Sequence, residues 1–506
     1  PPASTLQGQP PAYYYNYIDT VSLHVTADML NFMGYDAANM GNHDVETGRA
    51  VFDRWAGDCH APALGANIIE TATGKTHFPP YVTPARDAVK IAFLGMITPA
   101  IPVWLSENLW RGLRFDDMEE TARKWMKIIR EKERPDIVIG MFHAGQDALL
   151  MGGKYRENAS LDVARNVPGF DIVLMGHDHA RECKKVQNVA GDSVLVMDPA
   201  SNGIVVSDID ITVTLRNGKV TDKQIDGVLT ETAPYGISGE FMERFSPQYA
   251  TIQDFVSKRI GRFTKTVSTR PAYFGSSAFI DLIHTLQLDI SGADISLAAP
   301  LSYDTQIKEG DIYVYDMFNL YKYENMLYTM KLSGKEVHDA LEMSYDLWTN
   351  RMTSPDDHIL LLRDQPREGA ADRAAFKNFS FNFDSAAGII YTVDVTKPCG
   401  SKVTILSMAD GTPFHMDKMY TVALNSYRGN GGGELLTKGA GISQDELKER
   451  IISSTDKDLR YYLMQYIEQK KVIEPRALGQ WKFVPEEWAV PASKRDYEFL
   501  FGTNRN

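Results

Sequence analysis

The stretch DIVLMGHDHA, residues 171–180, joins a short apolar segment to a turn that carries two histidines. Two more apolar segments have a similar form: residues 90–96 (KIAFLGM) and residues 136–142 (DIVIGMF) each end at a small or polar residue. Between them, residues 117–132 have helical spacing and many charges. Buried strands separated by a helix predict an α/β domain, here a four-layer α-β-β-α domain, in which ligands gather in loops at the strand ends.

The rest of the chain predicts a second domain. A turn-rich segment and a charged amphipathic helix over residues 240–260 fill residues 234–262, which we interpret as a linker and hinge helix. This division leaves a first domain over residues 1–233 and an α+β domain over residues 263–506. The elements expected in the second domain are helices over residues 278–288 and 337–344 and strands over residues 312–320, 326–332, 391–395 and 420–424.

Composition limits the classes of function. A chain of 506 residues is too long for one core and favours several domains. Its net charge of -13 argues against broad binding to duplex nucleic acid, whereas a small phosphorylated substrate could bind if metal ions supplied positive charge. The three cysteines form no CxxC pair, and their odd number excludes a fully paired disulfide framework. No apolar run is long enough for a transmembrane segment.

The histidines of the first stretch indicate a metal site. His177 and His179 stand at i and i+2 of a turn, so their imidazoles can face two neighbouring ions. His143 directly follows the apolar run at residues 136–142, which we expect to lie beside the strand that precedes His177. Three imidazoles at one sheet edge favour a metal site over the alternative of unrelated loop or core histidines.

A third motif, Gly41-Asn42-His43-Asp44, supplies further chemistry. The amide oxygen of Asn42 is a suitable ligand for a hard metal ion. His43 lies next to Asp44, whose carboxylate can hold the imidazole in one tautomer and keep it protonated, as a general acid requires. The alternative is a plain Asn/Asp turn, which would explain this motif alone but not the three motifs together.

Together these motifs resemble the superfamily of 5'-nucleotidases and 2',3'-cyclic-nucleotide 2'-phosphodiesterases, which are calcineurin-like metallophosphoesterases with a C-terminal nucleotide-binding domain. GNHD, the histidine of FHAG and GHDHA occur in the order of that family. The resemblance implies two divalent metal ions, with Mn, Zn, Fe, Co and Mg not distinguished. Asn42, His143 and His177 would ligate one ion and His179 the other. His43, paired with Asp44, would be the general acid that protonates the leaving oxygen.

The second half resembles the nucleotide-binding domain of the same superfamily, in which two aromatic rings sandwich the base. The segment LYKYEN matches its aromatic-x-Asn strand, and NSYRGNGGG matches its second aromatic with a glycine-rich loop. The resemblance implies Tyr323 and Tyr427 as the stacking pair, with Asn325 and Arg428 as further substrate contacts. A tyrosine before a glycine loop suits stacking because every base has a π-face. Two ordinary core or surface tyrosines are the alternative.

The glycine loop favours the branch of 2',3'-cyclic-nucleotide phosphodiesterases and 3'-nucleotidases, because 5'-nucleotidases usually carry Phe and Asp where this chain has Tyr427 and Gly433. A 5'-nucleotidase or UDP-sugar hydrolase is the alternative enzyme. A non-catalytic nucleotide-binding or surface-interaction protein is the alternative of another class. We also expect a small-molecule nucleotide substrate and a monomer or weak dimer. The resemblance implies a periplasmic or cell-surface location.

The start of the chain departs from the family pattern. An Asp-x-His motif and a Gly-Asp motif, whose Asp bridges both ions, normally precede the GNHD motif, and neither stands before it in this chain. Residues 6–10 match the residues just after the Gly-Asp motif, which puts Ser4 where the bridging Asp should be. No signal peptide is visible, and PPAS does not resemble a natural start. We therefore expect one tightly bound ion or none, and little activity, from the chain as numbered.

Overall fold

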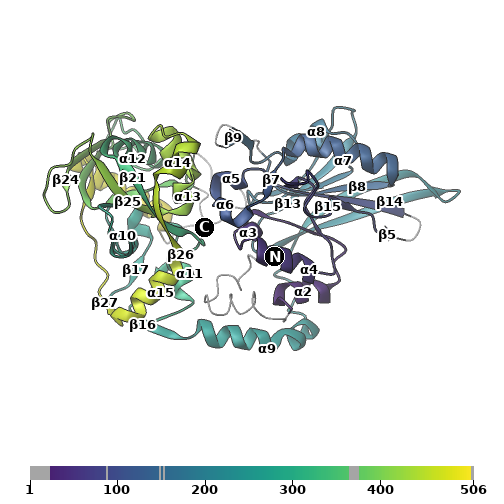
Figure 1. Ribbon diagram of the computed structural model, residues 1–506, viewed down its shortest axis with the longest axis horizontal. Helices are drawn as coiled ribbons and strands as arrows, with labels where there is room; N and C mark the ends of the chain where they lie inside the picture. The colour runs from purple at the N-terminus through teal and green to yellow at the C-terminus, as the bar shows by residue number, and fades with distance from the viewer. Residues whose placement is uncertain (1–22, 87–88, 147–149, 152–153, 364–374, 503–506) are drawn as a thin grey trace. The chain divides into compact units, whose positions relative to one another are not determined.

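The structure is a computed structural model, and it describes residues 23–86, 89–146, 150–151, 154–363 and 375–502. The chain divides into two compact units, Pro1–Ile252 and Gln253–Asn506 (Figure 1). The boundary falls inside helix α9 (Gly239–Val256), within the segment predicted as a linker. Each unit mixes helices and strands, which confirms the predicted α/β class. No helix in the described part of the chain has both the length and the apolar character that crossing a membrane requires.

The first unit is built on a seven-stranded sheet with the order β12-β13-β11-β8-β6-β4, in which β5 also pairs with β6. The three strands predicted from apolar runs are β6 (Val89–Ile97), β8 (Ile137–His143) and β11 (Ile172–Leu174), and they lie parallel in its middle. Middle strands of a parallel sheet are buried on both faces, which explains their continuous apolar sequences. The other strands are β4 (Tyr81–Val82), β5 (Ala85–Arg86), β12 (Arg181–Gln187) and β13 (Ser193–Pro199).

Helices cover one face of this sheet and a β-hairpin covers the other. α7 (Met118–Lys132), which was predicted, and α8 (Ser160–Asn166) pack on the first face through a shared hydrophobic cluster (Figure 1). Asp117 caps α7 by accepting hydrogen bonds from two backbone N–H groups of its first turn. On the second face lies the hairpin of β14 (Val205–Arg216) and β15 (Lys219–Glu231), whose inward side chains alternate with exposed ones.

Shorter elements complete the first unit. Some of them carry or support the candidate site described below. They are α2 (Val25–Met33), β1 (Ala38–Asn39), α3 (Asn42–Val45), α4 (Arg49–Asp58), β2 (Ala63–Leu64), β3 (Ile68–Glu70), α5 (Ile101–Trp104), α6 (Glu107–Trp110), β7 (Leu113–Phe115), β9 (Leu150–Met151) and β10 (Tyr155–Arg156).

The second unit contains a five-stranded sheet, β22-β18-β25-β21-β26, and two three-stranded sheets, β20-β16-β27 and β24-β23-β28. The strands of these sheets are β16 (Arg259–Phe263), β18 (Ile295–Ala298), β20 (Gly310–Tyr313), β21 (Met326–Ser333), β22 (Ser385–Ala387), β23 (Ile389–Asp394), β24 (Val403–Met408), β25 (Met419–Asn425), β26 (Ile451–Asp458), β27 (Val472–Ile473) and β28 (Trp481–Val484). A further pair is β17 (Val267–Ser268) and β19 (Gln306–Ile307).

Helices of the second unit pack into two hydrophobic cores: α12 into one, α10 and α15 into the other. The helical elements are η1 (Arg270–Tyr273), α10 (Ala278–Ser291), α11 (Asp316–Leu320), α12 (Gly334–Trp348), η2 (Ser380–Asn382), α13 (Ser426–Gly429), η3 (Gly432–Glu434), η4 (Leu435–Gly439), α14 (Gln444–Arg450), α15 (Leu459–Lys470) and α16 (Glu486–Phe501).

Two predicted elements differ from the structure. The helix predicted over residues 240–260 is α9 and ends at Val256, because residues 259–263 pair with β20 and β27 as strand β16. The strand predicted over residues 312–320 is wrong beyond Tyr313, since the rest forms helix α11. A short apolar run does not distinguish a strand from a buried helical turn, and here tertiary packing decides.

Candidate metal and nucleotide sites

Two histidine motifs lie at neighbouring strand ends. His143 is the last residue of β8, and β11 ends at Leu174, just before the turn that carries His177 and His179. β8 and β11 pair in parallel with Met141 opposite Leu174, so both motifs leave the sheet at the same edge. The predicted neighbourhood of these two strands is confirmed.

His143 lies at the centre of a cluster. Its Nε2 is 2.8 Å from Asn42 Oδ1, and its ring centroid is 5.3 Å from that of His177. Burial, and then the nearby His177, His43 and His179, lower the pKa of His143 well below its usual value. The imidazole is therefore neutral at pH 7, which is the form that ligates a metal.

The turn that carries His177 and His179 has an unusual backbone. Both residues have positive φ angles, 80° and 57°, a conformation that costs a non-glycine residue roughly 1–3 kcal/mol. Asp178 holds the turn, because its carboxylate accepts hydrogen bonds from the backbone N–H groups of Gln146 (3.0 Å) and Ala180 (3.2 Å). Backbone strain of this kind concentrates at functional sites, which is consistent with a ligand-binding turn.

His177 has two partners that the sequence analysis did not identify. Glu157 Oε1 lies 3.0 Å from His177 Nε2. Trp104, the last residue of α5, packs with its ring centroid 5.4 Å from that of the imidazole. Neither residue belongs to a histidine motif, so no local sequence pattern could have found them.

His43 has a carboxylate partner, but not the predicted one. Its Nδ1 lies 2.9 Å from Glu46 Oε2. Asp44 instead accepts a hydrogen bond from the backbone N–H of Gly41 (2.8 Å) and caps the short helix α3. The predicted pairing of His43 with Asp44 is therefore corrected to His43 with Glu46. In a helix, side chains at i and i+3 share a face, whereas adjacent side chains diverge.

The donor chemistry of the cluster suits a divalent cation. The 2.8 Å between Asn42 Oδ1 and His143 Nε2 is close to the roughly 3 Å between two ligands that each lie about 2.1 Å from one ion at a right angle. Among the residues that the structure describes, no three His, Cys, Asp or Glu side chains converge as a metal site. Ser4, which stands where the bridging Asp was expected, and residues 6–10, which match the segment after it, lie outside the described ranges.

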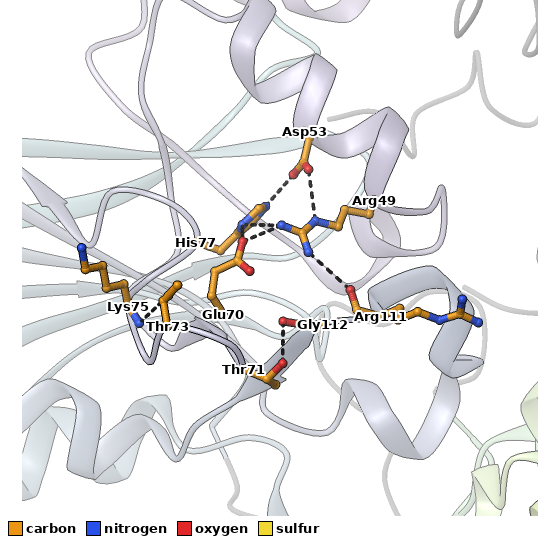
Figure 2. Close-up of polar contacts among 9 residues, drawn as sticks. All are labelled: Arg49, Asp53, Glu70, Thr71, Thr73, Lys75, His77, Arg111 and Gly112. Carbon is orange, nitrogen blue, oxygen red and sulfur yellow. Dashed lines mark hydrogen bonds and ion pairs between the residues drawn. The ribbon is translucent and has the colours of Figure 1, made fainter.

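A polar cluster fastens α4, the helix that follows α3 in the chain. Asp53 of α4 and Glu70 of β3 each lie 2.6 Å from a ring nitrogen of His77 (Figure 2). Arg49 forms ion pairs with both carboxylates. Burial opposes a charged imidazole, but the hydrogen bonds to Asp53 and Glu70 outweigh it and raise the pKa of His77. The cluster thereby ties α4 to β3 through charge.

In the second unit, the two predicted stacking residues share a third aromatic neighbour. Tyr323 lies just before β21, and Tyr427 lies in α13, directly after β25. The ring centroid of Phe381 is 6.4 Å from that of Tyr323, with 84° between the ring planes, and 6.1 Å from that of Tyr427, with 89°. All three residues are half-buried. Phe381 belongs to a separate segment of the sequence, which is why motif comparison did not find it.

The structure buries Arg428, which the resemblance implied as a substrate contact. It is 1% exposed, and its guanidinium donates two hydrogen bonds of 2.8 Å to Asp384 and one of 3.1 Å to the carbonyl of Phe381. It therefore supports the aromatic residues from the interior of the unit. Asn325 hydrogen-bonds the hydroxyl of Tyr321, whose pKa burial raises above its usual value.

Comparison with known proteins identifies relatives of the chain. Residues 259–438 match the family described as 5'-nucleotidase, C-terminal domain. The trifunctional nucleotide phosphoesterase YfkN of Bacillus subtilis is 25% identical over 95% of this chain but only 35% of its own length. The 2',3'-cyclic-nucleotide 2'-phosphodiesterase/3'-nucleotidase of Haemophilus influenzae is 25% identical over 90% of this chain and 76% of its own length. A 5'-nucleotidase of Vibrio cholerae is 32% identical over 31% of this chain and 29% of its own length.

Solved structures share the fold over most of the chain. A Staphylococcus aureus protein in complex with α-ketoglutarate has a TM-score of 0.74 at 18% identity, covering 94% of this chain and 88% of that one. The 5'-nucleotidase precursor of Thermus thermophilus has a TM-score of 0.62 at 20% identity, with 94% and 87% covered. The chain therefore shares a two-domain fold with these proteins, and its residues 259–438 match the 5'-nucleotidase C-terminal domain. The chain is thus similar over most of its length to relatives named 2',3'-cyclic-nucleotide 2'-phosphodiesterase/3'-nucleotidase, and residues 259–438 carry the match to the 5'-nucleotidase C-terminal domain.

Proposed function

We propose that this protein hydrolyses the phosphoester bonds of nucleotides, with 2',3'-cyclic nucleotides and 3'-nucleotides as its main substrates. The observation that carries the proposal is the contact of His143 with Asn42 (2.8 Å) beside His177 at one sheet edge. Relatives named cyclic phosphodiesterase/3'-nucleotidase match 90% and 92% of the chain, whereas the Vibrio cholerae 5'-nucleotidase matches 31%. This difference in coverage favours the cyclic phosphodiesterase branch.

In this proposal, Asn42, His143 and His177 would hold one divalent cation and His179 a second. When bound, such cations supply positive charge that polarises the phosphoryl oxygens and lowers the pKa of water. Glu157 orients His177 through its contact with Nε2. Trp104 would shield the same imidazole from water by packing over it.

His43 would act as the general acid. Its Nδ1–H donates to Glu46, which fixes the tautomer and leaves Nε2 to give a proton to the departing alcohol oxygen. General acid catalysis of this kind contributes roughly 10²–10⁴-fold in rate. The second unit would bind the nucleoside, with Tyr323 and Tyr427 on the faces of the base and Asn325 at its edge or at the ribose. We place the protein in the periplasm or at the cell surface, which fractionation of cells would test.

The test compares hydrolysis of 2',3'-cyclic AMP, 3'-AMP and 5'-AMP in the presence of Mn²⁺. The enzyme is the protein with any residues that precede Pro1 in its gene, and the matched control is the His43→Ala variant. We expect the first two substrates to be cleaved faster than 5'-AMP. Faster cleavage of 5'-AMP would assign the protein to the 5'-nucleotidases instead. If no substrate is cleaved faster than by the variant, hydrolysis is refuted, and nucleotide binding alone would support the non-catalytic alternative.

A further inference from the structure

The ring of Phe381 contacts both Tyr323 and Tyr427, the two tyrosines proposed to stack on the base. Its ring stands nearly perpendicular to both, at 84° to Tyr323 and 89° to Tyr427, and at similar centroid distances of 6.4 and 6.1 Å. On its own flank, the ring stacks with Phe379 at 5.1 Å and 8°. Perpendicular planes at these centroid distances are those of favourable edge-to-face aromatic pairs, so one ring contacts both tyrosines.

Buried contacts fix Phe381 in this position. Its carbonyl accepts a hydrogen bond (3.1 Å) from Arg428, the residue next to Tyr427. The same guanidinium contacts Asn382 Oδ1 (3.4 Å) and Asp384 (2.8 Å), so one buried side chain ties the Phe381 segment to the Tyr427 turn. The Phe381 ring also packs against the hydrophobic core that supports Tyr323. The ring is therefore a fixed wall and not a side chain that is free to swing away.

The glycine loop closes on the same residues. A Cβ at Gly432 would lie 2.5 Å from the ring of Tyr427. A Cβ at Gly433, whose φ is 67°, would lie 2.1 Å from Asn382 Oδ1. Because neither position can accept a side chain without displacing its neighbour, the loop backbone holds Tyr427 and the Phe381 segment at a fixed separation.

We propose that Phe381 is a specificity-determining residue that forms the end wall of the base slot between Tyr323 and Tyr427, so that the slot selects bases by shape. This inference rests on the proposed function. A phenyl ring offers the base edge no hydrogen-bond donor or acceptor, so the wall limits the size of the base at that edge and does not itself distinguish the polar groups there. The ribose and phosphate must stay outside, so the edge opposite the glycosidic bond enters deepest and meets the wall.

The experiment measures binding of two nucleosides to the full chain by calorimetry: adenosine, and 1,N6-ethenoadenosine, which is enlarged at that deepest edge. We expect wild type to bind adenosine about 10-fold or more tightly than the etheno compound, since one surplus group in a closed pocket costs roughly 10–200-fold. Phe381→Ala should reduce this ratio to about 3-fold or less. Phe381→Leu, which keeps bulk at the wall, should retain most of the discrimination. Inosine should bind wild type within about 10-fold of adenosine, because the wall reads no edge groups.

The outcomes separate this inference from the proposed function. If wild type binds neither nucleoside, both the nucleotide-binding role and the wall fail. If wild type binds them equally, or if Phe381→Ala leaves the ratio unchanged while binding adenosine, only the wall fails. Should Phe381→Ala unfold, the Phe381→Leu ratio and the inosine measurement decide: a strong preference for adenosine over inosine would overturn selection by shape. A Phe379→Ala variant that alters the ratio more than Phe381→Ala would place the wall at the wrong phenylalanine.

Discussion

The histidine cluster of the first unit and the aromatic cluster of the second unit are built in different ways. His143 ends strand β8, and His177 lies in the turn after the paired strand β11, so the sheet itself places them. Tyr323, Phe381 and Tyr427 come from three separate segments, and a buried ion pair holds two of these together. The difference teaches that substitutions in the first cluster should mainly affect chemistry, whereas loss of the support beneath the second should mainly affect folding.

The largest effect that would sharpen this comparison is expected from Arg428→Met. The change leaves Asp384, whose side chain is 5% exposed, buried without its partner. Removing one member of a buried ion pair costs about 3–5 kcal/mol of the free energy of unfolding. Urea unfolding followed by tryptophan fluorescence measures it. Arg476→Met is the matched control, since the Arg476 side chain is 72% exposed and should change stability by about 0.5 kcal/mol or less. A loss below about 1 kcal/mol would show that the pair does not support the aromatic cluster.

The next effect concerns the first cluster. His143→Ala removes a proposed ligand, so we expect a fall in turnover of 2',3'-cyclic AMP beyond the roughly 10–100-fold that loss of an outer-shell partner causes. Bound Mn²⁺, measured by atomic emission, should fall with it, while unfolding changes less than in Arg428→Met. His60→Ala, at an exposed position of the same unit, serves as control. Unchanged metal content and turnover in His143→Ala would show that the histidine cluster takes no part in metal binding or catalysis.

A smaller effect distinguishes the role of Glu46, which contacts His43, from that of Asp44, which caps α3. We expect Glu46→Gln to lower kcat roughly 10–100-fold, because the partner that orients His43 is lost. The basic limb of the pH–rate profile, where a general acid loses its proton, should shift with it. Asp44→Asn should instead cost about 1 kcal/mol of stability through the weakened cap of α3, with the smaller effect on kcat. If the two variants exchange these phenotypes, the sequence-based pairing of His43 with Asp44 is restored.

The smallest effect is a pH dependence of stability at His77. Its pKa is raised in the folded state by Asp53 and Glu70 against the opposing effect of burial. The stabilisation is therefore complete below the unfolded pKa of about 6.5 and is lost as pH rises through the folded pKa. Relative to His77→Gln, wild type should gain stability at pH 5.5, by about 1 kcal/mol or less, and this advantage should shrink at pH 8.5. Thermal unfolding at both pH values measures this advantage, with His60→Gln as the control variant. A difference in stability between wild type and His77→Gln that is the same at both pH values would contradict the charged cluster.

The sequence determined much of the first unit. Continuous apolar runs predicted β6, β8 and β11, because middle strands of a parallel sheet are buried on both faces. The runs of β8 and β11 each lead into a histidine motif, so pairing of these two strands was enough to bring His143 and His177 to one edge. The order of the GNHD, FHAG and GHDHA motifs also indicated the superfamily whose C-terminal domain matches residues 259–438.

Only the tertiary structure decided which side chains meet across separate segments. Glu46 faces His43 because a helical turn puts i and i+3 on one face, and Glu157 and Trp104 reach His177 from other segments. Phe381 meets both tyrosines, and Arg428 is buried beneath them, through long-range packing. Sequence motifs record chemistry that is local along the chain. Packing, ion-pair burial and ring contacts depend on distances in space, which residue spacing alone does not fix.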